Sequence, residues 1–221
     1  MYKPPMPTFD SHRVKTLLLL LILPVVMTPS SSAQAQQSET PPATAQASVD
    51  QPRWANRGHW NFGLQVGYGV ENNIPRNISH VNMLIFQPNL GLIVKNFQSG
   101  PLRRFELVNE GVIGNAVHPG GHMLGTTLFF RFDFKPHKTV MPFFDAGASA
   151  MHTTLATRAP EVSGTTQFMP QGGLWIQYFF RPQRAFVIEY RYFHMSNAGL
   201  QEPNEGFNGS MITLGFRWLR R

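Results

Sequence analysis

The 221-residue chain contains no cysteine, and only 14% of its residues are charged. Without cysteine, the protein has neither disulfides nor an N-terminal lipid-anchored cysteine. The sequence also lacks any apolar run of the ~20 residues that a transmembrane helix requires. If the chain enters a membrane, it must do so as a closed β-barrel, the other fold that satisfies every backbone polar group in lipid.

Several functional motifs are also missing. The chain has no glycine-rich phosphate loop, no GxSxG nucleophile elbow and no nucleic-acid-binding motif. The formal charge is +7, and it is +5 once residues 1–35, with three basic residues and one acid, are removed. For an exported chain, anionic lipid headgroups are a better partner for this charge than nucleic acid.

The N-terminus has the three parts of a secretory signal peptide. Lys3, Arg13 and Lys15 form a basic region, residues 17–27 read LLLLLILPVVM, and Ala33-Gln34-Ala35 is a small-x-small cleavage pattern. This predicts a signal peptide over 1–35. The Ala-, Gln-, Ser-, Thr- and Pro-rich segment 36–56 predicts a flexible linker, which leaves 57–221 as the folded domain.

The domain alternates with a period of two. In WNFGLQVGYGV, residues 60–70, large apolar side chains take one face, and glycine and amides take the other. A helix would scatter these apolar residues all round, so the pattern predicts a strand. About eight such segments follow one another between turn signals, an even number.

Long strands, polar faces rich in glycine and the export signal predict an all-β fold: an eight-stranded antiparallel transmembrane β-barrel of the outer membrane, apolar side outward. A soluble lipid-binding barrel is the alternative. In the membrane barrel, the charged residues of the polar faces would form an ion network that fills the lumen. These residues are Lys95, Glu106, Glu110, Arg131, Asp133, Asp145, Glu189, Arg191 and Arg217.

Connection lengths predict the orientation of this barrel. Segments 99–103, 135–139 and 180–184 are short turns, whereas the connections 71–79, 152–166 and 197–206 are longer. In outer-membrane barrels the short turns are periplasmic and the long loops external. We therefore expect residues 194–196 at the external rim, facing the outer leaflet.

A candidate catalytic group ends the seventh predicted strand. His194 and Ser196 continue its lipid-facing register, and Asn208 begins the same face of the next strand. A serine beside a histidine is the minimum for nucleophilic catalysis, with a third group holding the imidazole. The Asn197 side chain or the backbone N–H of Gly199 would supply an oxyanion site.

The segment HMSNAGLQEPNEGFN, residues 194–208, closely resembles the active-site segment of the PagL-type lipid A 3-O-deacylases. These are eight-stranded outer-membrane barrels that hydrolyse the ester-linked 3-hydroxyacyl chain at position 3 of lipid A. The resemblance implies lipid A or lipopolysaccharide as substrate and no cofactor or metal. It also implies that His194 is the general base, Ser196 the nucleophile, and Asn197 with Gly199 the oxyanion region, with Asn204 as a further motif residue.

One position departs from this family. Where the well-known member has a glutamate that orients the histidine, twelve residues after the serine, this chain has Asn208. An amide oxygen can accept the imidazole N–H, but it does not stabilise the imidazolium as a carboxylate does. Glu205 or Glu202 is the alternative third residue.

Two other interpretations remain open at this point. A non-catalytic outer-membrane barrel with a structural or adhesion role would need only the strands and loops, and a homodimer is compatible with either function. The histidines of HPGGH, His118 and His122, have a spacing that a metal could use, but no thiol or carboxylate lies near. A flexible surface loop is the better interpretation of that segment.

Overall fold

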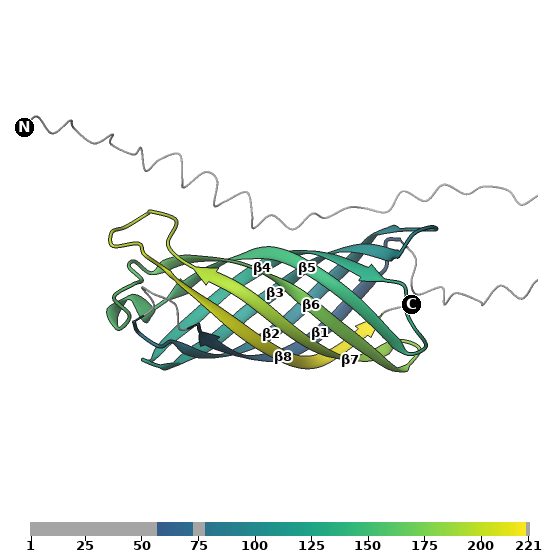
Figure 1. The fold of residues 1–221 in the computed structure, drawn as a ribbon, viewed down its shortest axis with the longest axis horizontal. Coiled ribbons are helices and arrows are strands. Elements are labelled where there is room, and N and C mark those ends of the chain that lie inside the picture. Colours follow the sequence, from purple (N-terminus) through teal and green to yellow (C-terminus); the bar gives the residue numbers. More distant parts are fainter. Residues whose placement is uncertain (1–56, 73–77, 220–221) are drawn as a thin grey trace, which may run out of the picture. The chain divides into compact units, whose positions relative to one another are not determined.

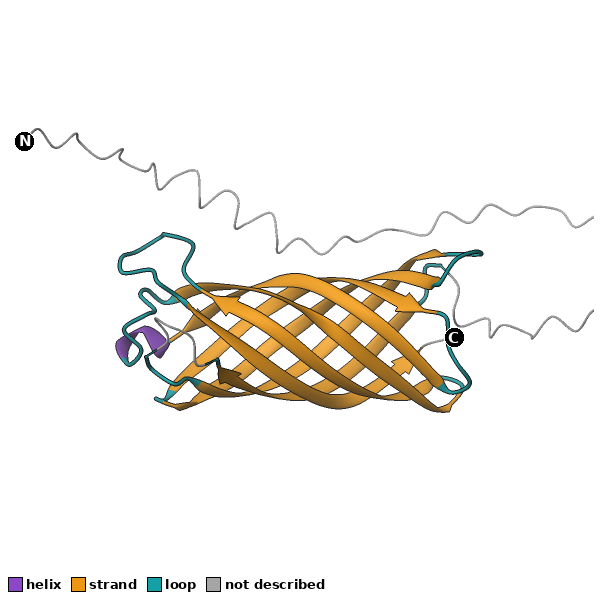
Figure 2. Cartoon of the chain, in the orientation of Figure 1, coloured by secondary structure: helices purple, strands orange, loops and turns teal. Residues whose placement is uncertain are grey.

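Eight long antiparallel strands follow one another in sequence order and close into a barrel (Figures 1 and 2). The computed structural model describes residues 57–72 and 78–219. The strands are β1 (Trp60–Glu71), β2 (Asn82–Asn96), β3 (Leu102–His118), β4 (Gly121–Phe134), β5 (Val140–Thr153), β6 (Thr166–Arg181), β7 (Arg184–Met195) and β8 (Phe207–Leu219). Pairing of β1 with β8 closes the sheet, which leaves no free edge.

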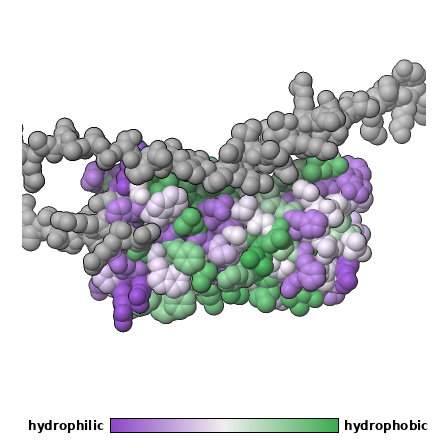
Figure 3. All heavy atoms as spheres, turned by 180° about the vertical axis from the view of Figure 1, so that it is seen from behind, coloured by the Kyte–Doolittle hydropathy of each residue, from purple (hydrophilic) through white to green (hydrophobic). Residues whose placement is uncertain are grey.

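The predicted eight-stranded antiparallel barrel is confirmed. Along β1 the exposed and buried residues alternate, with the aromatic and aliphatic side chains of WNFGLQVGYGV outward and the glycines and amides inward. Apolar residues gather across the middle and lower part of the face shown in Figure 3, and hydrophilic residues lie at both ends. The predicted signal peptide and linker, 1–35 and 36–56, fall outside the described residues.

The described part of the chain contains one short helical turn, η2 (Leu155–Thr157), in the connection after β5. None of the helices described there is long and apolar enough to cross a membrane.

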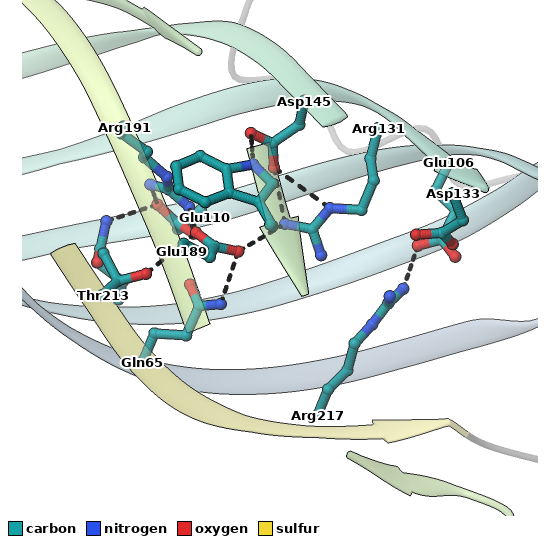
Figure 4. Close-up of polar contacts among 12 residues, drawn as sticks. Gln65, Glu106, Glu110, Arg131, Asp133, Asp145, Glu189, Arg191, Thr213 and Arg217 are labelled. Carbon is teal, nitrogen blue, oxygen red and sulfur yellow. Dashed lines mark hydrogen bonds and ion pairs between the residues drawn. The ribbon is translucent and has the colours of Figure 1, made fainter. Parts of the chain in front are cut away.

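A buried ion network fills the middle of the lumen, as the sequence predicts (Figure 4). Arg131 pairs with Asp145 at 2.9 Å and with Glu189 at 3.2 Å. Arg191 contacts Glu110 at 2.5 Å and also pairs with Glu189. Arg217 pairs with Glu106 nearer the end of the barrel at which β8 finishes. All of these side chains are almost completely buried.

The network differs from the prediction at two positions. Lys95 is exposed, with Nζ 5.1 Å from the centre of the Phe97 ring, so its predicted place in the lumen is wrong. A register shift between Ile93 and Lys95 interrupts the alternation there, because a β-bulge re-aims the residues that follow it. Arg104 is instead buried in the lumen, where it contacts Glu106 at 2.7 Å and Asp133.

Towards one end of the barrel the lumen changes from ionic to apolar. Six methionines on six different strands, together with Phe193, Phe207 and residues of the connection after β5, form a buried cluster there. The methionines are Met83, Met123, Met151, Met169, Met195 and Met211. Methionine fills irregular gaps well, so this cluster, which we call the methionine plug, closes the end of the barrel.

The connections differ between the two ends of the barrel. The connections 97–101, 135–139 and 182–183 are short and lie at the turn end. The longer connections 72–81, 154–165 and 196–206 lie at the loop end, beside the methionine plug. The predicted HPGGH loop is a tight hairpin, because His118 ends β3 and Gly121 begins β4.

Glu189 accepts hydrogen bonds from four side chains of the lumen, and we predict that Glu189→Gln destabilises the barrel strongly. Its carboxylate accepts hydrogen bonds from Arg131, Arg191, Gln65 and Thr213. Neutralising it leaves two buried arginines without full compensation, a change that typically costs about 3–5 kcal/mol. Denaturant-induced unfolding in lipid vesicles measures this change.

The matched control is Ile188→Val, the neighbouring position on the lipid face of the same strand, where we expect a shift below about 1.5 kcal/mol. Equal effects of the two substitutions would show that the ion network does not set the stability of the barrel.

Candidate active site

His194 and Asn208 form a cross-strand pair at the loop end of the barrel. They are direct partners in the antiparallel register of β7 and β8, and both are half-buried on the outer face. His194 Nδ1 lies 3.0 Å from Asn208 Oδ1. Because an amide oxygen only accepts, Nδ1 carries the proton in this hydrogen bond. The other ring nitrogen, Nε2, is then left as the basic one.

Ser196 follows directly after β7 and is held by β6, which flanks β7 on the edge opposite to β8. Its backbone pairs with Phe168 of β6 in an isolated antiparallel bridge, with hydrogen bonds of 3.0 Å and 2.7 Å. Because of this bridge, Ser196 keeps the outward register of His194 although β7 ends at Met195. Its hydroxyl makes no hydrogen bond to another described residue, and its side chain is half-buried.

The side chains of His194 and Ser196 both lie close to Gly206. A Cβ built on Gly206 would lie 2.9 Å from Ser196 Cβ, 3.0 Å from His194 Cε1 and 2.5 Å from the Met195 carbonyl oxygen. Its φ of +64° also lies in the left-handed region that glycine adopts most easily. The chain returning to β8 thus packs against both candidate catalytic residues at a place where only glycine fits.

The loop between β7 and β8 is organised around Asn197. Its side-chain amide donates hydrogen bonds to the Ser163 carbonyl oxygen at 3.0 Å and to the Gln201 carbonyl oxygen at 2.6 Å. Its Oδ1 accepts from Gly199 N at 2.9 Å. The backbone N–H of Asn197 donates to Asn204 Oδ1, also at 2.9 Å.

The structure therefore places Asn197, Gly199 and Asn204 in one hydrogen-bonded turn next to Ser196. Both donors that the sequence analysis assigns to an oxyanion, the Asn197 side chain and the Gly199 N–H, have partners within the loops. Their oxyanion role stays a prediction.

Glu161 links three loops next to this turn through hydrogen bonds, and no motif in the sequence marks it. Its carboxylate accepts hydrogen bonds from the backbone N–H groups of Ile78 and Ser79 and from the Ser79 hydroxyl. Its carbonyl oxygen accepts from Gly206 N at 2.9 Å. The first connection is thereby linked, through Glu161, to the glycine that packs on His194 and Ser196.

These hydrogen bonds also set the protonation of Glu161. Burial raises the pKa of this carboxyl, but the bonds from Ser79 and Ile78 outweigh burial and hold the pKa below its ordinary value. A carboxyl with a lowered pKa stabilises the fold at pH values above its unfolded pKa. That stabilisation is lost as the pH falls through the folded pKa.

The alternative third residues lie elsewhere. Glu202 and Glu205 are exposed in the loop, and neither makes a hydrogen bond to His194 in the structure. No group of three or more potential ligands in the described segments could hold a metal ion. His122 Nδ1 lies 2.6 Å from Asn115 Oδ1, so this side chain of HPGGH contacts a neighbouring strand.

Fold and site together define a class: an outer-membrane β-barrel with a serine, a histidine and an amide gathered on the outer face of one rim. The model of one protein family, described as lipid A 3-O-deacylase (PagL), matches residues 43–217. The match covers most of the chain, and the protein belongs to this family.

A solved structure of an outer membrane enzyme has the same fold. The crystal structure of the outer membrane enzyme PagL is similar with a TM-score of 0.53 and 16% identity, over 70% of this chain and 97% of that chain. Neisserial surface protein A (NspA) is similar with a TM-score of 0.49 and 12% identity, over 73% of this chain and 97% of that one. No curated protein sequence matches the chain.

We predict that Gly206→Ala displaces His194 and Ser196, because the new methyl group would overlap with both side chains. The matched control is Gly199→Ala, where φ is also positive, at +78°, but nothing lies within 4 Å of the added Cβ. Both variants carry the backbone strain of a left-handed alanine, about 1–2 kcal/mol. The nuclear magnetic resonance signals of the His194 ring should shift in Gly206→Ala and stay in place in Gly199→Ala. Unshifted signals in both would contradict the packing described here.

Proposed function

We propose that the protein hydrolyses an ester-linked 3-hydroxyacyl chain at position 3 of lipid A. The match to the lipid A 3-O-deacylase family over residues 43–217 is the observation that carries this proposal. The site geometry supports it, since the His194 ring is hydrogen-bonded to Asn208, and both His194 and Ser196 lie against Gly206.

In the proposed mechanism, Ser196 Oγ attacks the ester carbonyl carbon while its proton moves to His194 Nε2. The tetrahedral intermediate collapses, the C–O bond to the sugar breaks, and His194 returns the proton to the leaving sugar oxygen. Water then attacks the acyl-enzyme, again giving a proton to His194, and Ser196 and the free hydroxy fatty acid are released. Asn208 Oδ1 accepts the Nδ1–H throughout and keeps the ring in the reactive tautomer.

The oxyanion that forms in each half-reaction needs donors, and Asn197 with Gly199 are the proposed ones. Because these donors are bonded within the loops, substrate binding would exchange the Asn197–Gly199 bond for a bond to the developing charge. Asn204 would keep the turn in place through its bond to the Asn197 N–H.

The proposed substrate reaches this site from the membrane. Long connections are external in outer-membrane barrels, so the loop end, with His194 and Ser196, would face the outer leaflet. An open apolar groove of about 590 Å³ runs along the outer face beside Tyr190 and Ser210, two residues from Asn208 on β8. Such a groove suits an acyl chain that remains in the lipid phase. The oligomeric state stays a prediction.

We expect Ser196→Ala to remove lipid A deacylation. Loss of the nucleophile in a serine hydrolase costs about 10⁶ in kcat, so no product should be detected. The measurement is mass spectrometry of lipid A from cells that express each variant in folded form. Thr126→Val is the matched control, because it removes a hydroxyl from the outer face of β4, away from the site. Unchanged lipid A in cells with the folded wild type would favour a non-catalytic barrel.

We also expect Asn208→Asp to raise the rate. In a serine protease triad the change from acid to amide lowers turnover by ~10⁴, so restoring a carboxylate should increase kcat at least tenfold. Asn208→Ala should lower it, because the ring loses its partner. Steady-state hydrolysis of lipid A in detergent measures both changes. If Glu202→Gln or Glu205→Gln lost activity while Asn208→Ala kept it, the residue that orients His194 would be a glutamate of the loop and not Asn208.

A further inference from the structure

Exposed cations surround the turn end of the barrel, opposite the candidate active site. They come from the segment just before β1, the start of β7, the ends of β2 and β6, and the connection after β4, so they are spread around the circumference. We call this group the turn-end collar. Its members are all exposed: Arg57, Lys95, Lys135, Lys138, Arg181 and Arg184.

No exposed carboxylate lies at this end in the part of the chain that the structure describes. Glu106, Glu110, Asp133, Asp145 and Glu189 are buried in the lumen, and Glu71, Glu161, Glu202 and Glu205 lie at the loop end. Every ion pair found among the described residues joins lumen side chains. The collar cations therefore have no anionic partner within the described barrel.

Aromatic side chains lie directly beside the collar on the outer face. Trp60 is 48% exposed and Trp218 is 36% exposed, and the rings of Phe62 and Trp218 lie 5.8 Å apart. Arg184 is the strand partner of Trp218. Aromatic rings at the end of a membrane segment mark the level of the lipid headgroups, so the collar lies at the height of the lipid phosphates.

We propose that the turn-end collar binds the headgroups of anionic glycerophospholipids in the leaflet that faces the short turns. Unpaired lysine and arginine at headgroup level attract anionic lipid, and each strengthens the association about fivefold near a strongly anionic surface. Among the described residues of the loop end, four carboxylates accompany Arg158, so these residues form no such surface. The collar thus contacts lipid headgroups at the turn end of the barrel alone. This binding does not depend on the proposed hydrolase function.

The test uses quenching of the collar-side tryptophans by brominated lipid. Trp60 and Trp218 face lipid, whereas Trp175 is 3% exposed in the lumen and is shielded. Trp54, outside the described residues, is replaced by Phe in all variants. The chain is folded into phosphatidylcholine vesicles that contain phosphatidylglycerol, with one of the two lipids brominated. The quenching by brominated phosphatidylglycerol is divided by the quenching by brominated phosphatidylcholine. This ratio gives the relative binding constant of the anionic lipid beside Trp60 and Trp218.

We expect the wild type to prefer phosphatidylglycerol severalfold, and high salt to weaken this preference. The variant Arg57→Gln/Lys95→Gln/Arg184→Gln removes three collar cations that lie just before β1 or on the strands paired with β1 and β8, which carry the two tryptophans, and it should bring the ratio close to one. The charge-preserving variant Arg57→Lys/Lys95→Arg/Arg184→Lys should keep the preference, and so should Arg158→Gln at the loop end. Heat-modifiable migration on gels shows that each variant is folded.

Three outcomes would overturn the proposal. The first is a ratio near one for the folded wild type, and the second is a glutamine variant with the same ratio as the wild type. The third is a preference that inorganic phosphate removes and chloride of equal ionic strength does not, since the collar would then be a site for free phosphate and not for lipid.

Discussion

Charge burial inside the barrel is the constraint on which the rest of the structure depends. Arg131, Arg191 and Arg217 can stay buried in the lumen only because carboxylates of other strands, on the next strand for Arg131 and across the barrel for Arg191 and Arg217, meet them at hydrogen-bonding distance. These long side chains fill the space that an eight-stranded barrel encloses. The period of two then turns the apolar face of each strand outward, and that outward face is what makes the chain a membrane protein.

Side chains fill the lumen, so the proposed reaction takes place on the surface of the barrel. The methionine plug closes the loop end from within, and the candidate catalytic residues lie on the rim and outer face. His194 and Asn208 are held by the β7–β8 ladder, which is part of the barrel wall. Ser196 depends instead on the bridge to Phe168 and on the loop that Glu161 and Asn197 organise. The proposed nucleophile is thus positioned partly by strands and partly by loops.

Much of this architecture could be predicted from the sequence because strands repeat every two residues. The same periodicity places His194 opposite a residue that starts the next strand, and Arg104 on the face of Glu106. Lys95 could not be placed, since a bulge breaks the alternation just before it. Contacts such as Glu161 with Gly206, or Ser163 with Asn197, join loops far apart in sequence, and no local pattern encodes them. The proposed chemistry came from a fifteen-residue resemblance rather than from spacing alone.

The outward position of His194 and Ser196 has a kinetic consequence for the proposed hydrolase. A site on the outer wall of a barrel meets its substrate by diffusion within the plane of the membrane, in two dimensions. Its rate should follow the mole fraction of substrate among the surrounding lipids, and not the amount of substrate per volume of solution. Adding inert lipid at constant total substrate would then slow the enzyme by surface dilution.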